Sequence, residues 1–499
     1  MKSNWCLGLL AISAIGTLTS CSGQKSSPCV TNCGGGGGNA SLTISLFDTP
    51  PAGTSVLSFT LPIAGISLTP SSGSPASVTT SVSSLEVTRL QTDSMVIADQ
   101  ASVPAASYTA INVTLGPTSS TNNLFINTSG STITSSAGSC PNATICVLPV
   151  GAIFTVNIPL SLTLAANQKQ WIGLDFNLRK AITSPSGANS ISVDFSQTGV
   201  LTAITTARKG IPAGSTDTLE DFIGKVTAYT PNSSITVVSG LTGVSLTATL
   251  SSTTEYDLAP VNYSNCSGTA SACLAVGSTV SMDTVLSSAG TFTATEVDVL
   301  DSVSVDEVEG IILPTSTAGL VQLVLADKVS ASGDATLGAS TTTAGTIIFL
   351  TATTPNFYVD TKTLSSQLSN PPGFAGSGDL LGGQVVRAHV TNIASTNGAI
   401  TATANNVLLR WSRLSGTVNS VSGNVFTIAN LPSYVYFLNS ALSTSAAQVL
   451  TYQNLTAFDG ITSTSDSTFQ NGTSVSIRAL YLNSPPAQYP FQAGKVRVP

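Results

Sequence analysis

The chain has 499 residues, too many for one hydrophobic core, so its length predicts several domains. Charged residues make up 8% of it, against roughly a quarter in an average soluble protein, so Ser, Thr, Asn and Gly must form most of the surface. These side chains suit strands and turns, and the composition predicts an all-β protein. The net charge of −7 argues against nucleic acid as a partner, because phosphate binding needs clustered Lys and Arg.

Residues 1–20 have the features of a secretory signal peptide. Lys2 precedes an apolar stretch from Leu7 to Ile15, and small residues follow it. The segment Leu18-Thr19-Ser20-Cys21 resembles the bacterial lipobox, which implies that Cys21 is lipidated and becomes the N-terminus. We therefore expect a lipid-anchored lipoprotein outside the cytoplasm. An ordinary signal peptide with a chance cysteine is the alternative.

The residue after the expected lipidation site bears on which membrane holds the protein. Ser22 resembles the sorting context of outer-membrane lipoproteins, because the inner-membrane aspartate signal is absent. We expect the outer membrane if the host has two membranes. Beyond Ile15 no uninterrupted apolar run approaches the roughly 18 to 20 residues that a spanning helix needs.

Six further cysteines lie in three close pairs, which are candidates for disulfides in an oxidising compartment. The pairs are Cys29 and Cys33, Cys140 and Cys146, and Cys266 and Cys273. Each bridge would restrict the unfolded chain by about 2–3 kcal/mol and so pin a local loop. A zinc site is the alternative, but these spacings and the single histidine do not supply its usual four ligands, and we expect neither a metal nor a cofactor.

Residues 21–40 and 41–205 differ sharply in pattern. The first range ends in a run of glycines and predicts a flexible tether. The second alternates apolar and polar residues with the period of half-buried strands, which predicts a β-sandwich. The apolar positions are Leu42, Ile44, Leu46, Ile111, Val113, Leu115, Phe154, Val156, Ile158, Leu160, Leu162, Leu164, Ile172, Leu174, Phe176, Leu178, Ile191, Val193 and Phe195. Ser84 to Asp93 could form a short helical turn or a strand.

Three short segments of this region have a familiar order. They are Leu46-Phe47-Asp48-Thr49-Pro50, Val103-Pro104-Ala105-Ala106-Ser107-Tyr108 and Leu174-Asp175-Phe176. In this order they resemble the bacterial domain of unknown function 4382, although Ala106 stands where that family typically has glycine. The resemblance implies an antiparallel β-sandwich outside the cell membrane, and it implies no chemistry.

After a linker at 206–220, one pattern occurs three times, in 221–303, 304–414 and 415–499. Each unit has an early and a late strand opened by glycine, with a short segment rich in aromatic and acidic residues between them. The glycines are Gly224 and Gly277, Gly310 and Gly383, and Gly416 and Gly472. The segments are Thr254-Glu255-Tyr256-Asp257, Phe357-Tyr358-Val359-Asp360 and Thr456-Ala457-Phe458-Asp459. The units resemble the domain of unknown function 5666, and we expect three small β-barrel-like modules.

We find no catalytic constellation in the sequence. His389, the single histidine, alternates with Val386, Ala388 and Val390, which places it on the wetter face of a strand. We interpret it as a solvated side chain, because no nucleophile and orienting acid accompany it. Nucleophile elbows, P-loops, zinc-protease motifs and EF-hand loops are absent from the sequence.

The acidic residues and the aromatic residues leave two other possibilities open. The densest acidic stretch contains Glu296, Asp298, Asp301, Asp306, Glu307 and Glu309, and it could bind calcium or, as a pair of acids, hydrolyse a glycoside. We interpret it as a solvated connection between two modules. Asp48 and Asp175 fit a turn and a strand. Trp171, Trp411, Tyr434 and Tyr436 could stack on sugars, and core positions are the simpler interpretation.

From these patterns we expect a non-catalytic, lipid-anchored cell-envelope protein. It would act as a spacer or as an interaction or adhesion surface for an envelope protein or a polysaccharide. The alternative is a carbohydrate-active enzyme, or a carbohydrate-binding or calcium-dependent module. An enzyme should gather two or three acids with raised pKa values in one cleft.

Overall fold

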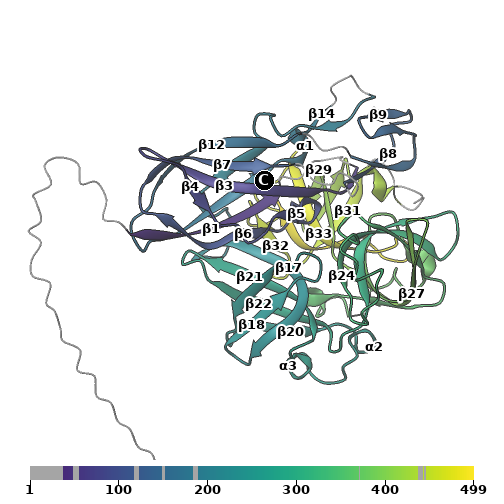
Figure 1. Cartoon of the computed structure of the whole chain (residues 1–499). Coiled ribbons are helices and arrows are strands. Elements are labelled where there is room, and N and C mark those ends of the chain that lie inside the picture. Colours follow the sequence, from purple (N-terminus) through teal and green to yellow (C-terminus); the bar gives the residue numbers. More distant parts are fainter. Residues whose placement is uncertain are drawn as a thin grey trace, which may run out of the picture. The chain divides into compact units, whose positions relative to one another are not determined.

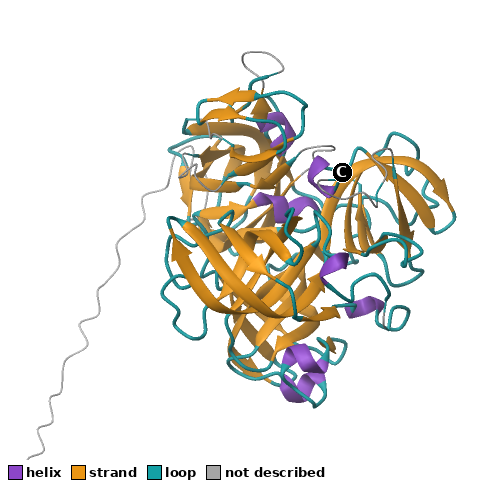
Figure 2. Ribbon diagram, turned by 90° about the vertical axis from the view of Figure 1, so that its right-hand side faces the viewer, coloured by secondary structure: helices purple, strands orange, loops and turns teal. Residues whose placement is uncertain are grey.

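Strands dominate the described chain, and its helices have only three to five residues (Figures 1 and 2), which confirms the all-β prediction. The structure is a computed structural model that describes residues 38–48, 55–116, 123–148, 152–183, 189–369, 371–436, 442 and 446–498. All of these residues belong to one compact unit. None of the described helices is long and apolar enough to cross a membrane.

The N-terminal region is built from short and medium strands. Its elements are β1 (Asn39–Asp48), β2 (Val56–Ser58), β3 (Thr60–Pro70), β4 (Ala76–Val78), β5 (Ser84–Glu86), the 3-10 helix η1 (Val87–Gln91), β6 (Met95–Pro104), β7 (Ser107–Leu115), β8 (Leu124–Asn127), β9 (Ile133–Ser135), β10 (Gly138–Cys140), β11 (Thr144–Val147), β12 (Phe154–Thr163), β13 (Lys169–Phe176), the helix α1 (Leu178–Ala181), β14 (Ile182–Thr183), β15 (Ser192–Val193) and β16 (Leu201–Ile204).

Two larger sheets share one hydrophobic core in this region. One has the order β16-β13-β1-β6, and the other has the order β12-β7-β3-β4 with β5 beside β3. Leu42 and Ile44 of β1 and Ile111 and Val113 of β7 are among the buried residues of that core, as their alternation predicts. The sheets are not purely antiparallel, because β1 and β13 run parallel. More than 100 residues separate these two strands, which is ample for the crossover that a parallel pair requires.

The structure refines three local predictions for the N-terminal region. Residues 84–93 contain both a strand and a helical turn, β5 followed by η1. Leu178 leaves the strand pattern and starts α1, because the Asn177 side chain accepts a hydrogen bond from the Lys180 amide at 3.0 Å and caps that helix. The strand expected around Ile191 is limited to the two residues of β15.

Three barrels follow. The first contains β17 (Ser215–Thr230), β18 (Ser234–Val238), β19 (Ser245–Thr249), β20 (Glu255–Leu258), α2 (Val261–Ser264), α3 (Ala270–Cys273), β21 (Thr279–Ser287) and β22 (Phe292–Asp301). The second contains β23 (Glu307–Pro314), β24 (Leu320–Val329), β25 (Ile347–Thr351), β26 (Asn356–Val359), the 3-10 helices η3 (Lys362–Leu364) and η4 (Ser377–Asp379), β27 (Val385–Thr396) and β28 (Ala399–Arg410). The third contains β29 (Ser412–Ser422), β30 (Val425–Ala429), η5 (Ser433–Val435), β31 (Ala447–Thr451), β32 (Ala457–Asp459), β33 (Ser474–Tyr481) and β34 (Phe491–Arg497).

The three barrels have one topology. In the first, the strand order is β19-β18-β17-β21-β22, and a parallel pairing of β19 with β22 closes the barrel. The strand β20 adds to β22 in parallel outside this ring. The second and third barrels repeat the same order and the same closure. Five strands closed in this Greek-key order form a small barrel of the OB type, which agrees with the expected barrel-like modules.

The early glycine of each repeat has a packing role. A Cβ atom on Gly224 would collide with the carbonyl oxygen of Val238 on the neighbouring strand. The same collision would occur between Gly310 and Val324. Gly416 faces the carbonyl of Ala429 in the same way, so the repeated glycine permits a close approach of the first two strands of every barrel.

The barrels are joined by very short connections. The first barrel begins at Ser215, so its first strand occupies part of the range 206–220 that we interpreted as a linker. Only 302–306 separate β22 from β23, and only Trp411 separates β28 from β29. Because such connections leave little slack, neighbouring barrels must pack directly on one another.

Two of the three expected disulfides lie in the described residues. Cys140 is bonded to Cys146 and Cys266 to Cys273. Cys21, Cys29, Cys33 and the signal-peptide segment 1–20 lie outside the described residues, as does most of the tether 21–40.

Candidate functional site

The most unusual feature of the structure is where its few charges lie. At least 13 of the 24 acidic side chains and 8 of the 17 Lys and Arg side chains are buried in the described part of the chain. Charged side chains are almost never fully buried unless they are paired. The buried acids are Asp48, Asp93, Asp217, Asp221, Asp283, Glu296, Asp298, Asp301, Glu307, Glu309, Asp327, Asp360 and Asp459, and the buried bases are Lys328, Lys362, Arg387, Arg410, Arg413, Arg478, Lys495 and Arg497.

Equivalent positions of different barrels carry opposite charges. In the first barrel Asp283 on β21 lies opposite Glu296 on β22. At the matching place in the third barrel, Arg478 on β33 lies opposite Lys495 on β34. Like charges directly opposite each other are destabilising within a sheet. They are tolerated here because the two faces meet, with Arg478 Nη1 3.6 Å from Asp283 Oδ2.

The charges converge on Asp221, the centre of what we call the central ion cluster. Its carboxylate lies 2.8 Å from Lys362 Nζ, 2.9 Å from Arg413 Nη2, and 3.3 Å from both Arg410 Nη2 and Arg478 Nη1. Lys362 and Arg410 belong to the second barrel, and Arg413 and Arg478 to the third. Although burial raises the pKa of Asp221, Lys362 and the arginines hold it well below its ordinary value. One carboxylate of the first barrel therefore connects all three barrels.

The local backbone conformation directs the side chains of Asp221 and Lys362 toward each other. The pairing of β17 with β21 shifts register between Leu219 and Phe222, and Asp221 lies in this β-bulge with φ of 54°. The Asp283 side chain accepts a 2.7 Å hydrogen bond from the Asp221 amide and so satisfies the bulged backbone. Lys362 also adopts a left-handed φ, of 42°, where its ammonium is fully buried. Residues in such disfavoured conformations persist only where surrounding contacts hold them. We infer that the contacts of the central ion cluster hold the backbone at Asp221 and Lys362.

A second group surrounds Arg387 on β27. Its guanidinium contacts Glu307, and it lies 3.2 Å from Glu309 Oε2 and 3.3 Å from Asp327 Oδ2. Burial raises the pKa of Asp327 to about 6 against the opposing effect of Arg387. Burial raises the pKa of Glu307, but Arg387 and His389 together outweigh it and lower that pKa below its ordinary value.

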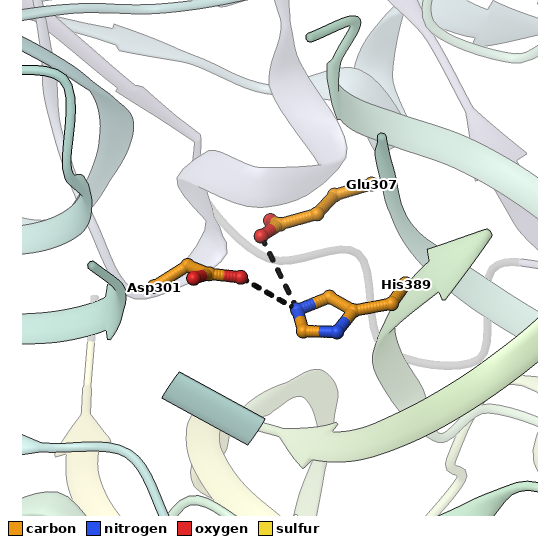
Figure 3. Close-up of side chains that lie close together, drawn as sticks. All are labelled: Asp301, Glu307 and His389. Carbon is orange, nitrogen blue, oxygen red and sulfur yellow. Dashed lines mark ion pairs between the residues drawn. The ribbon is translucent and has the colours of Figure 1, made fainter. Parts of the chain in front are cut away.

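His389 lies next to this group and completes what we call the histidine cluster, formed by Asp301, Glu307 and His389 (Figure 3). His389 Nε2 is 2.8 Å from Asp301 Oδ2 and 3.6 Å from Glu307 Oε1. One face of the imidazole ring stacks on the Tyr263 ring, with 4.1 Å between the ring centroids. Burial lowers the pKa of His389, but the two carboxylates outweigh it and raise the pKa to about 9.

Two interpretations drawn from the sequence are therefore wrong. His389 is buried rather than solvated, because α2 of the first barrel covers the outward face of its strand. The acidic stretch 296–309 is not a solvated connection, since Glu296, Asp298, Asp301, Glu307 and Glu309 are all buried. The alternation correctly identified the outward face of each strand, and a neighbouring barrel covers that face.

The family segments of the N-terminal region have structural roles. The Tyr108 hydroxyl donates a 2.6 Å hydrogen bond to the Pro104 carbonyl, which fixes the turn that contains Ala106. Asp48 is fully buried and accepts a 3.2 Å hydrogen bond from the Leu178 amide, and burial raises its pKa well above the ordinary value. Asp175 lies in β13 and adds to that rise by its charge.

The repeated acids and the candidate stacking aromatics are also internal. Asp360 contacts Arg410, and Asp459 lies 2.9 Å from Arg208 Nε and 3.1 Å from Arg497 Nε. Burial raises the pKa of Asp257, the matching acid of the first barrel, to about 6. Trp171, Trp411 and Tyr434 are buried, and Tyr436 is partly buried, so the first three have no face open to a sugar ring.

The sequence reasoning missed Asp221, Lys362 and Tyr263. A usable signal existed for Asp221, because Asp221, Glu307 and Arg413 each lie three residues before the repeated glycine, so an acid and a base exchange at that place. Lys362 has no charged counterpart, since Ala259 and Ile461 stand at its equivalent positions. No such signal pointed to Tyr263, whose partner lies in another barrel.

Comparison with known families agrees with the two resemblances. Residues 39–193 match the family model described as Domain of unknown function (DUF4382), and residues 223–298 match Domain of unknown function (DUF5666). The second match lies within the first barrel, and the other two barrels share its topology. No curated protein matches the chain.

Proposed function

We propose that this chain is a non-catalytic, lipid-anchored protein of the cell envelope whose β-modules serve as a spacer or as an interaction surface for an envelope protein or polysaccharide. The observation that carries the proposal is the burial of charge between the barrels. Ion pairs that join three barrels through Asp221, together with connections as short as one residue, support a stiff assembly. A stiff assembly at the end of a lipid tether suits a spacer.

The placement of the acids supports a non-catalytic role. A glycoside hydrolase needs two carboxyl groups roughly 5–10 Å apart that face a cleft wide enough for a sugar. Here the acids with raised pKa, such as Glu296 and Asp327, are packed inside. The cavity beside Asp221 and Arg413 has a volume of about 70 Å³, well below the roughly 300–1,000 Å³ of pockets that bind small molecules.

The outer surface supports contacts with neutral partners. A hollow of about 450 Å³ is lined by hydroxyl side chains and apolar side chains in nearly equal number, together with Glu86; the hydroxyl residues are Thr60, Ser81, Ser83, Ser84, Thr242 and Thr343. Hydroxyl groups both donate and accept hydrogen bonds, so they match the hydroxyls of a polysaccharide and the backbone of a protein.

Metabolic labelling with an alkyne fatty acid tests the anchor. We expect the wild type and a Cys29→Ser control to carry the label and to sediment with membranes. Cys21→Ser should be unlabelled and soluble. An unlabelled wild type, or wild type found in the cytosol, would contradict the proposal.

A glycan array and cross-linking in envelope extracts test the interaction surface. We expect a glycan or an envelope protein to be retained without being altered. Release of reducing ends from a retained glycan would show that the protein is an enzyme instead.

A further inference from the structure

The histidine cluster joins two barrels through three potential metal ligands. Asp301 ends β22 of the first barrel, Glu307 begins β23 of the second, and His389 lies on β27 beside it. We propose that this cluster binds a divalent first-row transition-metal ion, with Zn²⁺ the best fit. This site goes beyond the proposed function, which requires no metal.

The distances between the donor atoms suit a small cation. Zinc holds nitrogen and carboxylate oxygen at about 2.0–2.2 Å, so two ligands in tetrahedral geometry lie about 3.4 Å apart. The observed separations from His389 Nε2 are 2.8 Å to Asp301 Oδ2 and 3.6 Å to Glu307 Oε1, and all three donors lie within 4.8 Å of one another. Relative to that spacing, the two separations from His389 Nε2 would change by about 0.6 Å and about 0.2 Å, and the separation of the two carboxylate oxygens by at most about 1.4 Å. The three donors would then occupy three corners of a tetrahedron and leave the fourth for water.

A buried atom without a hydrogen bond points to the same ligand. Glu307 is fully buried, and its Oε2 contacts Arg387. The other oxygen, Oε1, accepts no hydrogen bond within the described chain, and Figure 3 shows it aimed at His389 Nε2. An unsatisfied buried acceptor destabilises the folded chain, and a cation placed between Glu307 and His389 would satisfy it.

The atoms that would not bind the metal are held in place. Asp301 Oδ1 accepts 3.1 Å hydrogen bonds from Asn265 Nδ2 and from the Val303 amide, and Asn265 Nδ2 also lies 3.3 Å from Oδ2. His389 Nδ1 lies 3.1 Å from the Asn406 side-chain amide. With metal on Nε2 the imidazole keeps its proton on Nδ1, so the Asn406 side chain would have to turn its oxygen from Asn356 toward Nδ1 to accept a hydrogen bond. Such outer contacts orient the ligands of protein metal sites.

The charge around the cluster favours a cation. Arg387 is shared among Glu307, Glu309 and Asp327, so it neutralises Glu307 only in part. Asp301 has no Lys or Arg partner among the described ion pairs. The choice of a transition metal over calcium follows from His389, because imidazole suits zinc and its neighbours, whereas calcium takes oxygen ligands.

Calorimetric titration of the chelator-treated full-length protein with ZnCl2 alone tests the proposal. We expect one ion bound per chain and a higher melting temperature, and Co²⁺ should develop the visible absorption of an ion with an imidazole ligand. His389→Gln should weaken Zn²⁺ binding more than 100-fold, and the orienting variant Asn265→Ala by about 10- to 100-fold. Glu255→Gln, an exposed acid in the first barrel, should bind as the wild type does.

Three results would overturn the proposal. The first is that wild type shows neither heat nor a melting shift at 1 mM ZnCl2. The second is that His389→Gln binds as tightly as the wild type, which would place the ion elsewhere. The third is binding of CaCl2 but not ZnCl2. Because the first and third use only wild type, the proposal stays testable if a variant does not fold.

Discussion

Removing the charge of Asp221 tests whether the central ion cluster holds the barrels together. The substitution Asp221→Asn keeps the size of the side chain and leaves four buried cations with one carboxylate fewer. Removing one partner of a buried pair costs about 3–5 kcal/mol, whereas an exposed pair is worth about 1 kcal/mol or less. Because Asp221 pairs with Lys362 and three arginines, we expect the loss of unfolding free energy to lie in the upper part of the range of about 3–5 kcal/mol.

Tryptophan fluorescence in urea measures this effect close to the cluster. Trp411 is buried between the second and third barrels, and the Arg478 guanidinium lies 5.4 Å from its ring. With a slope of about 3 kcal/mol per M, a loss of about 4 kcal/mol lowers the unfolding midpoint by about 1.3 M. The control Glu255→Gln removes an exposed acid from the same barrel and should leave the midpoint unchanged. Equal midpoints for Asp221→Asn and the control would refute the reasoning.

Three other predictions concern pH, packing and a disulfide. Burial raises the pKa of Glu296 to about 8, above its value near 4.5 in the unfolded chain, so folding is disfavoured as the pH rises from about 4.5 to 8. Glu296→Gln should therefore melt close to the wild type at pH 5 and clearly above it at pH 9, and a gain that does not grow with pH would contradict this. Gly310→Ala should cost about 1–3 kcal/mol in thermal melts because its Cβ meets a backbone carbonyl, whereas Gly65→Ala, with nothing within 4 Å, should be nearly neutral. Replacing Cys266 and Cys273 by Ser should expose their loop to proteolysis, because the closed loop restricts the unfolded chain by about 2–3 kcal/mol, and equal cleavage of oxidised and reduced wild type would argue against this.

Much of the fold followed from patterns that depend only on neighbours in the chain. Alternation of Ile111, Val113 and Leu115 placed a strand correctly because successive side chains of a strand point to opposite faces. The glycines Gly224 and Gly310 marked equivalent strands because each permits the same close approach. These features require no knowledge of distant residues.

The candidate sites did not follow from such patterns. Alternation places His389 on the outward face of its strand, and in an isolated barrel that face would meet water. Here Tyr263 and Asp301 of the preceding barrel cover it. The pairing of Asp221 with Arg478 joins residues 257 positions apart, and no local signal connects them.

The sequence by itself determined that the chain folds into strands, that three repeats follow the N-terminal region, and which cysteines stand close enough to pair. Only the tertiary structure decided that many of the few charged side chains are buried, because neighbouring barrels cover the faces that carry them. The physical reason is that periodicity fixes the direction in which a side chain points, while the dielectric environment and the partners of that side chain depend on what packs against the face.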